Sequence, residues 1–199
     1  MLTSALDHRR IAHTPKGAST RTQLFECARR VLIEEGLDAL AMRDLAQRCQ
    51  VKLGNLQYYY PTRDALLIAI IEAEAQLDRD AIRVAMTAQL SHEAMLQELV
   101  LALARRWHGD AGAIYAALTY LSLHCAEFRA LRKRVYLAFY AGLVELSRKF
   151  NPRASAERLN ERAQLLTMLL DGAPMQMPGR RPPALIDAVV REALRIAKG

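Results

Sequence analysis

A short segment, residues 52–60, gathers polar and aromatic side chains in the order K-L-G-N-L-Q-Y-Y-Y. Leu53 can meet a thymine methyl group and Asn55 can hydrogen-bond to a base or a phosphate. Gly54 has no side chain, so the backbone there can come close to another surface. A short helix that is polar and aromatic on its outer face is built to enter a major groove. We expect Leu53, Gly54, Asn55 and Tyr58 to line that groove.

Other polar side chains in and beside this segment are suited to the DNA backbone. We expect Lys52, Gln57, Tyr59 and Arg63 to hold phosphates, with Arg63 aided by the N-terminus of the helix that follows it. Arg21 completes the set of expected DNA contacts.

The helix before this segment is indicated by its apolar spacing. Thr20 and Gln23 form a T-x-x-Q capping box, which predicts a helix start. Gly36 stands where a left-handed residue ends a helix. Between them, the apolar positions that repeat along one helical face are Leu24, Phe25, Ala28, Val31 and Leu32.

Two shorter helices follow and complete a three-helix head. Leu45, Ala46 and Cys49 place small and apolar groups on one side of the second helix. Leu56 and Tyr60 face inward on the third. Pro61 cannot continue that helix, and Thr62 can cap the next one. The pair of short helices is a helix-turn-helix.

The residues at these positions carry a family resemblance. The matching residues are Ala28, Gly36, the run Arg43-Asp44-Leu45-Ala46, then Val51, Gly54, Leu56, Tyr59 and Tyr60, followed by Thr62-Arg63-Asp64 and Leu66. With these, residues 20–67 resemble the head of the TetR/AcrR family of bacterial transcriptional regulators. The resemblance implies that Arg43, at the start of the second helix, can reach a base edge. We expect it to contact guanine, for which Arg is the commonest partner.

Three residues depart from the family pattern. Ala41 stands where Ser or Thr is usual, and Ala can neither cap the second helix nor touch a phosphate. Gln50 replaces the usual Gly at the turn, which costs about 1 kcal/mol if the backbone there has a positive φ. Gln57 replaces a common phosphate-touching Tyr.

Composition suits a polyanionic partner. The 199 residues have a formal net charge of +7 and a sequence pI of about 9.6. The three cysteines, Cys27, Cys49 and Cys125, show no close pair and no metal-ligand spacing, which is typical of a reducing cytosol. Cys49 is interpreted as a packing residue rather than a redox sensor. No apolar run reaches membrane-spanning length and the start lacks a signal peptide, so we expect no membrane partner.

The whole chain is expected to be all-α, with about nine helices in three parts. Residues 1–19 are interpreted as a flexible arm, which either contacts DNA or is a disordered tail. Residues 20–66 form the DNA-binding domain. Residues 67–199 form a helical body for ligand binding and dimerisation, because no segment alternates with the period of a strand.

The dimer is expected to form through two long helices near residues 127–150 and 156–171, joined as a four-helix bundle with a second copy. The resemblance implies the same pairing. The expected interface residues are Val135, Phe139, Gly142, Leu143, Leu146, Leu159, Leu166 and Leu170. The alternative is that these apolar stripes pack in the chain's own core.

A small organic effector is expected among the aromatic residues of the middle helices, although an aromatic stripe is also typical of plain core. The expected ligand residues are Trp107, Tyr115, Tyr120, His124, Phe128 and Tyr136. No metal, other cofactor or catalytic residue is expected, because no catalytic motif is present.

These patterns favour a cytoplasmic bacterial regulator, associated with the nucleoid when bound, that is a repressor released from a palindromic operator by the effector. A DNA-organising or protein-interaction factor of the same fold, with no effector, is the alternative. A helical enzyme or carrier with a coincidental helix-turn-helix is a third hypothesis.

Overall fold

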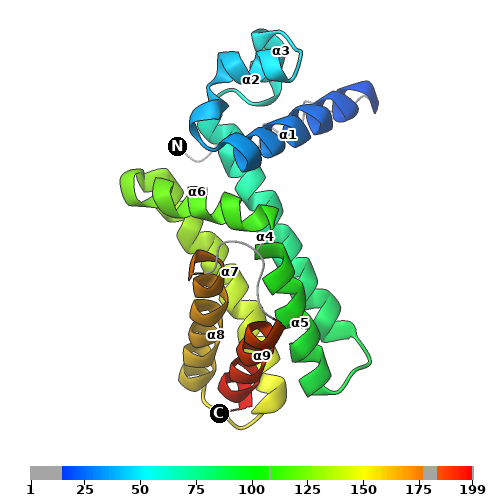
Figure 1. The fold of residues 1–199 in the computed structure, drawn as a ribbon, viewed down its shortest axis with the longest axis vertical. Helices are drawn as coiled ribbons and strands as arrows, with labels where there is room; N and C mark the ends of the chain where they lie inside the picture. The colour runs from blue at the N-terminus through cyan, green and yellow to red at the C-terminus, as the bar shows by residue number, and fades with distance from the viewer. Residues whose placement is uncertain (1–14, 108, 177–182, 199) are drawn as a thin grey trace. The chain divides into compact units, whose positions relative to one another are not determined.

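The computed structural model describes residues 15–107, 109–176 and 183–198. Every regular element within these ranges is helical, which confirms the all-α prediction (Figure 1). Nine α-helices and one short 3-10 helix lie in the described residues. They are α1 (Pro15–Glu35), η2 (Asp38–Leu40), α2 (Met42–Arg48), α3 (Leu53–Tyr59), α4 (Arg63–Thr87), α5 (His92–Trp107), α6 (Asp110–His124), α7 (Ala126–Phe150), α8 (Ala156–Gln176) and α9 (Pro183–Lys198).

The chain divides into two compact units, residues 1–72 and 73–199. The first unit, the head, holds α1, η2, α2, α3 and the first part of α4. The second unit, the body, holds the rest of α4 and helices α5 to α9. The division lies inside α4, near the boundary expected after residue 66.

The first helix begins at Pro15, so the start predicted at Thr20 is wrong. Proline suits the first turn of a helix, because the N–H that it lacks has no partner there. Residues 15–19 are therefore helical, and residues 1–14 of the expected arm lie outside the described residues. The predicted end is confirmed, since Gly36 has φ +85° and its N–H donates to the Leu32 carbonyl at 3.1 Å.

The core of the head joins its short helices to α1. Leu24, Ala28 and Leu32 of α1 are buried, as are Leu45 of α2 and Leu56 of α3. At the start of α4, the N–H of Ala65 donates to Thr62 Oγ1 at 3.0 Å, which confirms the predicted cap.

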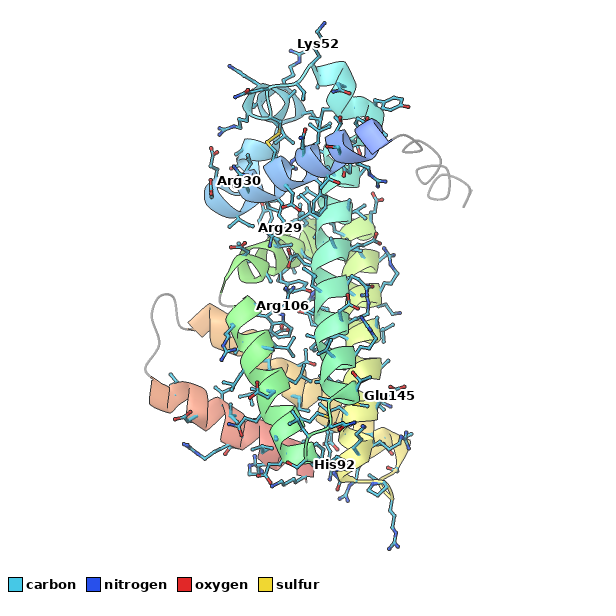
Figure 2. All side chains as sticks on the ribbon, turned by 90° about the vertical axis from the view of Figure 1, so that its right-hand side faces the viewer. Arg29, Arg30, Lys52, His92, Arg106 and Glu145 are labelled. Atoms are coloured by element: carbon cyan, nitrogen blue, oxygen red, sulfur yellow. A yellow bond between two sulfur atoms is a disulfide. The ribbon has the colours of Figure 1, made fainter. Side chains whose placement is uncertain are left out.

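A disulfide links Cys27 of α1 to Cys49, the residue that follows α2 (Figure 2). Cys49 was interpreted as a packing residue, and the structure instead places it in a covalent bond. The two cysteines are 22 residues apart in sequence, but their Cα atoms lie 5.9 Å apart, within the usual disulfide range. Sequence spacing could not show this, because the pairing depends on how α1 and α2 pack.

The body is built around one apolar cluster with contributions from α4 to α9. Leu99 and Leu103 of α5, Leu143 of α7 and Leu166 of α8 are among its buried members. The N–H of Ala94 donates to Ser91 Oγ at 3.2 Å, which confirms Ser91 as the cap of α5. Helix α8 continues past its expected end at Asp171. In the described ranges, no helix has the length and apolar character needed to cross a bilayer.

Candidate nucleic-acid interface and ligand pocket

The turn between α2 and α3 is tightly closed. The N–H of Gln50 donates to the Gln47 carbonyl at 3.0 Å, and the N–H of Val51 donates to the Ala46 carbonyl at 2.9 Å. Gln50 has φ 55°, a left-handed conformation that residues other than Gly and Asn rarely adopt. The backbone at this turn therefore has the positive φ at which a Gln side chain costs about 1 kcal/mol relative to Gly.

One exposed surface carries many of the expected DNA contacts. Gly54, Asn55, Gln57 and Tyr58 of α3 are exposed, as are Lys52 before α3 and Arg43 of α2. Tyr58 is 56 % exposed, a large fraction for an aromatic side chain, and its ring meets that of Tyr59 edge-on. Figure 2 shows Lys52 projecting away from the head. We call the exposed side of α2 and α3 the reading surface.

Four expected contacts are less exposed, and two of them already interact with other residues of the head. The four partly buried residues are Leu53, Tyr59, Arg21 and Arg63. The Arg63 guanidinium donates to the Leu37 carbonyl at 2.7 Å. The Arg21 guanidinium lies 5.8 Å from the centre of the Tyr60 ring. Burial raises the pKa of Tyr60, and Arg21 partly offsets that rise. Arg21 and Arg63 therefore stabilise the head, whatever else they bind.

The second unit holds a buried polar cluster around Asp78 of α4, which is 2 % exposed. Its carboxylate accepts three hydrogen bonds, from Arg106 Nε at 2.7 Å, Trp107 Nε1 at 2.9 Å and the Tyr115 hydroxyl at 2.6 Å. Arg106 Nη2 also pairs with Glu74 Oε2 at 3.0 Å. This Asp78 cluster ties α4 to α5 and α6.

Burial and charge set the protonation of this cluster. Burial alone would lower the pKa of Arg106, but Asp78 and Glu74 more than offset it, so the pKa lies above its ordinary value. Burial, together with the negative charge of Asp78, raises the pKa of Tyr115 far above its ordinary value. Tyr115 is therefore a hydrogen-bond donor at any physiological pH.

A small chamber lies beside the cluster, with aromatic walls. The space open to the centre of a water-sized sphere is about 20 Å³, enough for one or two water molecules. The chamber is lined by Ala75, Asp78, Trp107, Tyr115, Val135, Tyr136, Phe139 and Asp171. A larger ligand requires some of these side chains to move.

An open groove between α7 and α8 shares two lining residues with the chamber. By the same measure it offers about 380 Å³, within the usual range for small-molecule sites. It is lined by Arg129, Arg132, Lys133, Tyr136, Tyr140, Thr167, Met168 and Asp171. The shared residues are Tyr136 and Asp171, and the Tyr136 hydroxyl donates to Asp171 Oδ2 at 2.7 Å.

Asp171 lies between the chamber and the groove, and its pKa is raised. Burial raises its pKa, while the Tyr136 hydrogen bond and the Arg132 charge act in the opposite direction. Arg132 lies 5.2 Å from the centre of the Tyr136 ring. The wall between chamber and groove is thus a Tyr–Asp pair next to a guanidinium.

Residues 24–70 match the model of a family described as bacterial regulatory proteins, tetR family. The head of this chain therefore resembles the TetR family. A curated relative is the HTH-type transcriptional regulator PksA of Bacillus subtilis strain 168, 31 % identical over 81 residues. That match covers 40 % of this chain and 40 % of PksA, so it spans well under two thirds of the relative.

Solved structures of similar fold cover nearly the whole chain. Salmonella enterica GusR has a TM-score of 0.74 at 16 % identity, covering 94 % of this chain and 99 % of GusR. A candidate transcriptional regulator from Saccharomonospora viridis, in complex with choline, has a TM-score of 0.72 at 16 % identity, covering 89 % and 95 %. At such low identity these likenesses show the fold alone.

The ligand residues expected from the sequence separate into two groups. Trp107, Tyr115 and Tyr136 line the chamber. Tyr120 and His124 of α6 are exposed and do not line it, and Phe128 is buried in the core at 1 % exposure. The helical spacing of the aromatic residues does not distinguish those that line the chamber from those in the core or on the surface.

The residues expected at the dimer interface lie on the buried faces of α7 and α8, which pack inside the body. All but Gly142 are buried in the single chain, namely Val135, Phe139, Leu143, Leu146, Leu159, Leu166 and Leu170. A side chain at Gly142 would meet Ile82 of α4 at 3.1 Å, so this glycine permits close packing inside the body. The alternative stated above, that both stripes form the chain's own core, is the one the structure supports.

Sequence reasoning missed the charged residues of the second unit: Glu74, Asp78, Arg106 and Asp171. One signal was available. Glu74 and Asp78 lie four residues apart on the apolar stripe of α4 that includes Ile71 and Ile82. Two carboxylates on such a stripe indicate a buried polar site, because an unpaired charge there is very costly.

Proposed function

We propose that this chain is a TetR-family DNA-binding transcriptional regulator, a repressor released from a palindromic operator by a small organic ligand. The exposed reading surface carries the proposal, because it presents free polar groups on a short helix that follows a closed turn. A positively charged chain suits DNA as the partner. Arg43, Leu53, Gly54, Asn55 and Tyr58 are proposed to face the bases.

The phosphate contacts are proposed to come from Lys52, Gln57 and Tyr59, with Arg21 and Arg63 in supporting positions. Lys52 and Gln57 are exposed, and Tyr59 is partly buried. Selection of bound fragments from random-sequence DNA tests whether the chain binds a specific DNA sequence. Recovery of a two-fold symmetric consensus is the expected result, and recovery of unrelated sequences would contradict the proposal.

The dimer is proposed to form through the outer face of α7 and α8, where the structure leaves apolar side chains exposed. Leu137 is 56 % exposed and Leu165 44 %. These residues replace the buried ones expected from the sequence. A two-fold DNA site needs two heads, which is why a dimer belongs to the proposal.

Paired substitutions test this interface. Leu137→Asp with Leu165→Asp should convert the dimer to a monomer in sedimentation velocity, because charge would be buried without a partner. Val84→Asp is the matched control, since Val84 is also exposed, at 63 %, but on α4. A double variant that stays dimeric would place the interface elsewhere.

The ligand is proposed to be an apolar or aromatic molecule with a hydrogen-bond donor or a cationic group. Aromatic rings and a buried carboxylate favour such a group, and choline, bound by the Saccharomonospora viridis protein, is a cation. The ligand would enter through the groove, displace the Tyr136–Asp171 bond and reach the aromatic chamber. Movement of Ala75 or Asp78 would then act on α4, whose first part belongs to the head.

A pair of titrations tests the effector role. Small aromatic amines, with choline for comparison, are titrated into the protein with and without its selected DNA fragment. Linkage requires weaker ligand binding when DNA is bound, by a coupling of about 1–3 kcal/mol. The small volume of the chamber favours the alternative, a DNA-organising factor with no effector. Equal affinities, or no binding at all, would support that alternative.

A further inference from the structure

The disulfide of the head lies at the edge of the DNA-reading motif. Cys27 is on α1, and Cys49 is the residue on which α2 ends. The N–H of Cys49 donates to the Leu45 carbonyl at 2.9 Å, so this residue still belongs to the last turn of α2. Gln50, with its positive φ, follows at once, and α3 begins at Leu53. The disulfide therefore fixes the residue from which the turn starts.

Between this end of α2 and α1, the described residues also show one ion pair. Arg48 pairs with Glu35, but the two side chains are 41 % and 39 % exposed. An ion pair this exposed contributes little, because water screens both charges. The apolar contacts of Leu45 and Ala46 lie further back along α2. The covalent bond is thus the strongest single constraint at the C-terminal end of the helix.

Both cysteines are partly exposed rather than buried, so a small molecule in solution can reach this pair. A regulator that meets DNA inside a bacterial cell works among reducing thiols. Disulfides in that setting are usually transient, and they are often redox-sensing. An accessible disulfide beside the reading helix has the properties of a reversible bond rather than a permanent one.

We propose that Cys27 and Cys49 form a reversible dithiol–disulfide site, and that its oxidised form holds the reading surface in the geometry that binds DNA. The inference rests on the proposed function only where DNA affinity is measured. The chemistry of the two thiols and the order of the turn can be measured without any DNA.

Oxidation would proceed by exchange with a low-molecular-weight disulfide. The thiolate of one cysteine attacks a sulfur of that disulfide, forming a mixed disulfide and releasing one small thiol. The thiolate of the other cysteine then attacks the protein sulfur, closing the Cys27–Cys49 bond and releasing the second small thiol. Two electrons and two protons pass from the protein to the small disulfide, and a dithiol reverses the exchange.

Reduction frees Cys49 from α1 while Gln50 remains in a strained conformation. A turn that is no longer held at its first residue samples more conformations, and DNA binding must then order it again. We expect the reduced protein to bind its DNA fragment about tenfold more weakly than the oxidised protein. We also expect faster hydrogen exchange of the backbone amides at residues 50–53.

The experiment uses the full-length chain carrying Cys125→Ser, which leaves only this pair. The protein is equilibrated with mixtures of dithiothreitol and its cyclic disulfide, free thiols are trapped with a maleimide, and mass spectrometry gives the oxidised fraction. Hydrogen exchange and affinity for a fragment selected from random DNA are measured in both states. The matched control carries Cys27→Ser and Cys49→Ser in the same background, and its affinity should not respond to the mixtures.

A bond that opens and closes reversibly, with the expected changes in exchange and affinity, supports the proposal. Equal affinities in the two states overturn it, as does a pair that cannot be reduced in the folded chain or cannot re-form. If neither state binds any fragment, the proposed function fails, and hydrogen exchange decides the inference alone. Unchanged exchange at residues 50–53 would then count against the site.

Discussion

The head and the body use polar side chains in opposite ways. In the head, Arg43 and Lys52 are exposed and hold no partner in the described chain. In the body, Asp78 is buried and its carboxylate is satisfied by an arginine, an indole and a phenol. The exposed charged groups stay hydrated, so they do not destabilise the fold and can bind another molecule. Burying the Asp78 carboxylate is costly unless every hydrogen-bond partner is present, so the stability of the body depends on this cluster.

The substitution with the largest expected effect on stability removes the buried carboxylate of Asp78. Asp78→Ala leaves the Arg106 charge, the Trp107 N–H and the Tyr115 hydroxyl without their acceptor. We expect a loss of about 3–5 kcal/mol in the free energy of unfolding, the usual cost of breaking a buried ion pair. Urea denaturation followed by circular dichroism measures it.

Asp80→Ala is the matched control, because Asp80 lies two residues further along α4 and its bonds to Arg83 and Gln76 are exposed. Its loss should be far smaller than that of Asp78→Ala, as for most surface substitutions. Similar losses for the two variants would remove the distinction between buried and exposed polar groups.

The corresponding test in the head should change binding and leave folding intact. Arg43→Ala should cost about 1–3 kcal/mol on the selected fragment and relax preference at one base position, whereas Lys52→Ala should weaken all sequences alike and lower the salt slope by about one unit. Fluorescence anisotropy at several salt concentrations separates these effects. A uniform loss for Arg43→Ala would show that this side chain does not read a base.

The turn between α2 and α3 allows a smaller test. Gln50→Gly should raise the free energy of unfolding of the head by about 0.5–1 kcal/mol, because Gly adopts φ 55° without strain. Gln47→Gly is the control inside α2, where Gly should instead cost about 1 kcal/mol. Thermal melting of both variants checks the signs, and a destabilised Gln50→Gly protein would show that the Gln side chain has a role of its own.

The smallest effect is expected at the wall between chamber and groove. Burial raises the pKa of Asp171, so the folded chain holds this proton more tightly than the unfolded chain. Stability then falls as the pH rises from the unfolded pKa, near 3.9, through the raised folded pKa. Arg132 opposes the rise, and Asp78 adds to it.

Asp171→Asn has no carboxyl to titrate, so its stability relative to the parent should improve across that window and stay constant above it. Denaturation at a series of pH values measures the difference. A difference that does not vary with pH would show that the Asp171 carboxyl has the same pKa in both states.

Local patterns predicted the head well because its elements are set by nearby residues. The cap at Thr62 and the left-handed Gly36 each depend on a few consecutive residues, and the structure confirms both. The start of α1 was missed because a capping-box pattern such as Thr20 and Gln23 can also occur inside a longer helix. The Cys27–Cys49 bond was missed because it depends on packing between helices.

In the body, the sequence predicted the helices but not which residues form the interface or the buried polar cluster. Apolar periodicity finds the buried stripe of α7, yet it does not say whether that stripe meets another helix of the chain or a second copy. Val135 and Phe139 therefore appeared as interface residues although they pack inside. The partner of Asp78 lies 28 residues away on α5, a distance that no local pattern records.

The wall made by Tyr136 and Asp171 belongs to two spaces at once. A compound that occupies the groove and breaks their hydrogen bond removes a boundary of the chamber, even if it never enters the chamber. Two different small molecules would therefore not bind independently there. Reciprocity requires that each changes the affinity of the other by the same factor. Mixtures of weak compounds could then act where each compound alone does not.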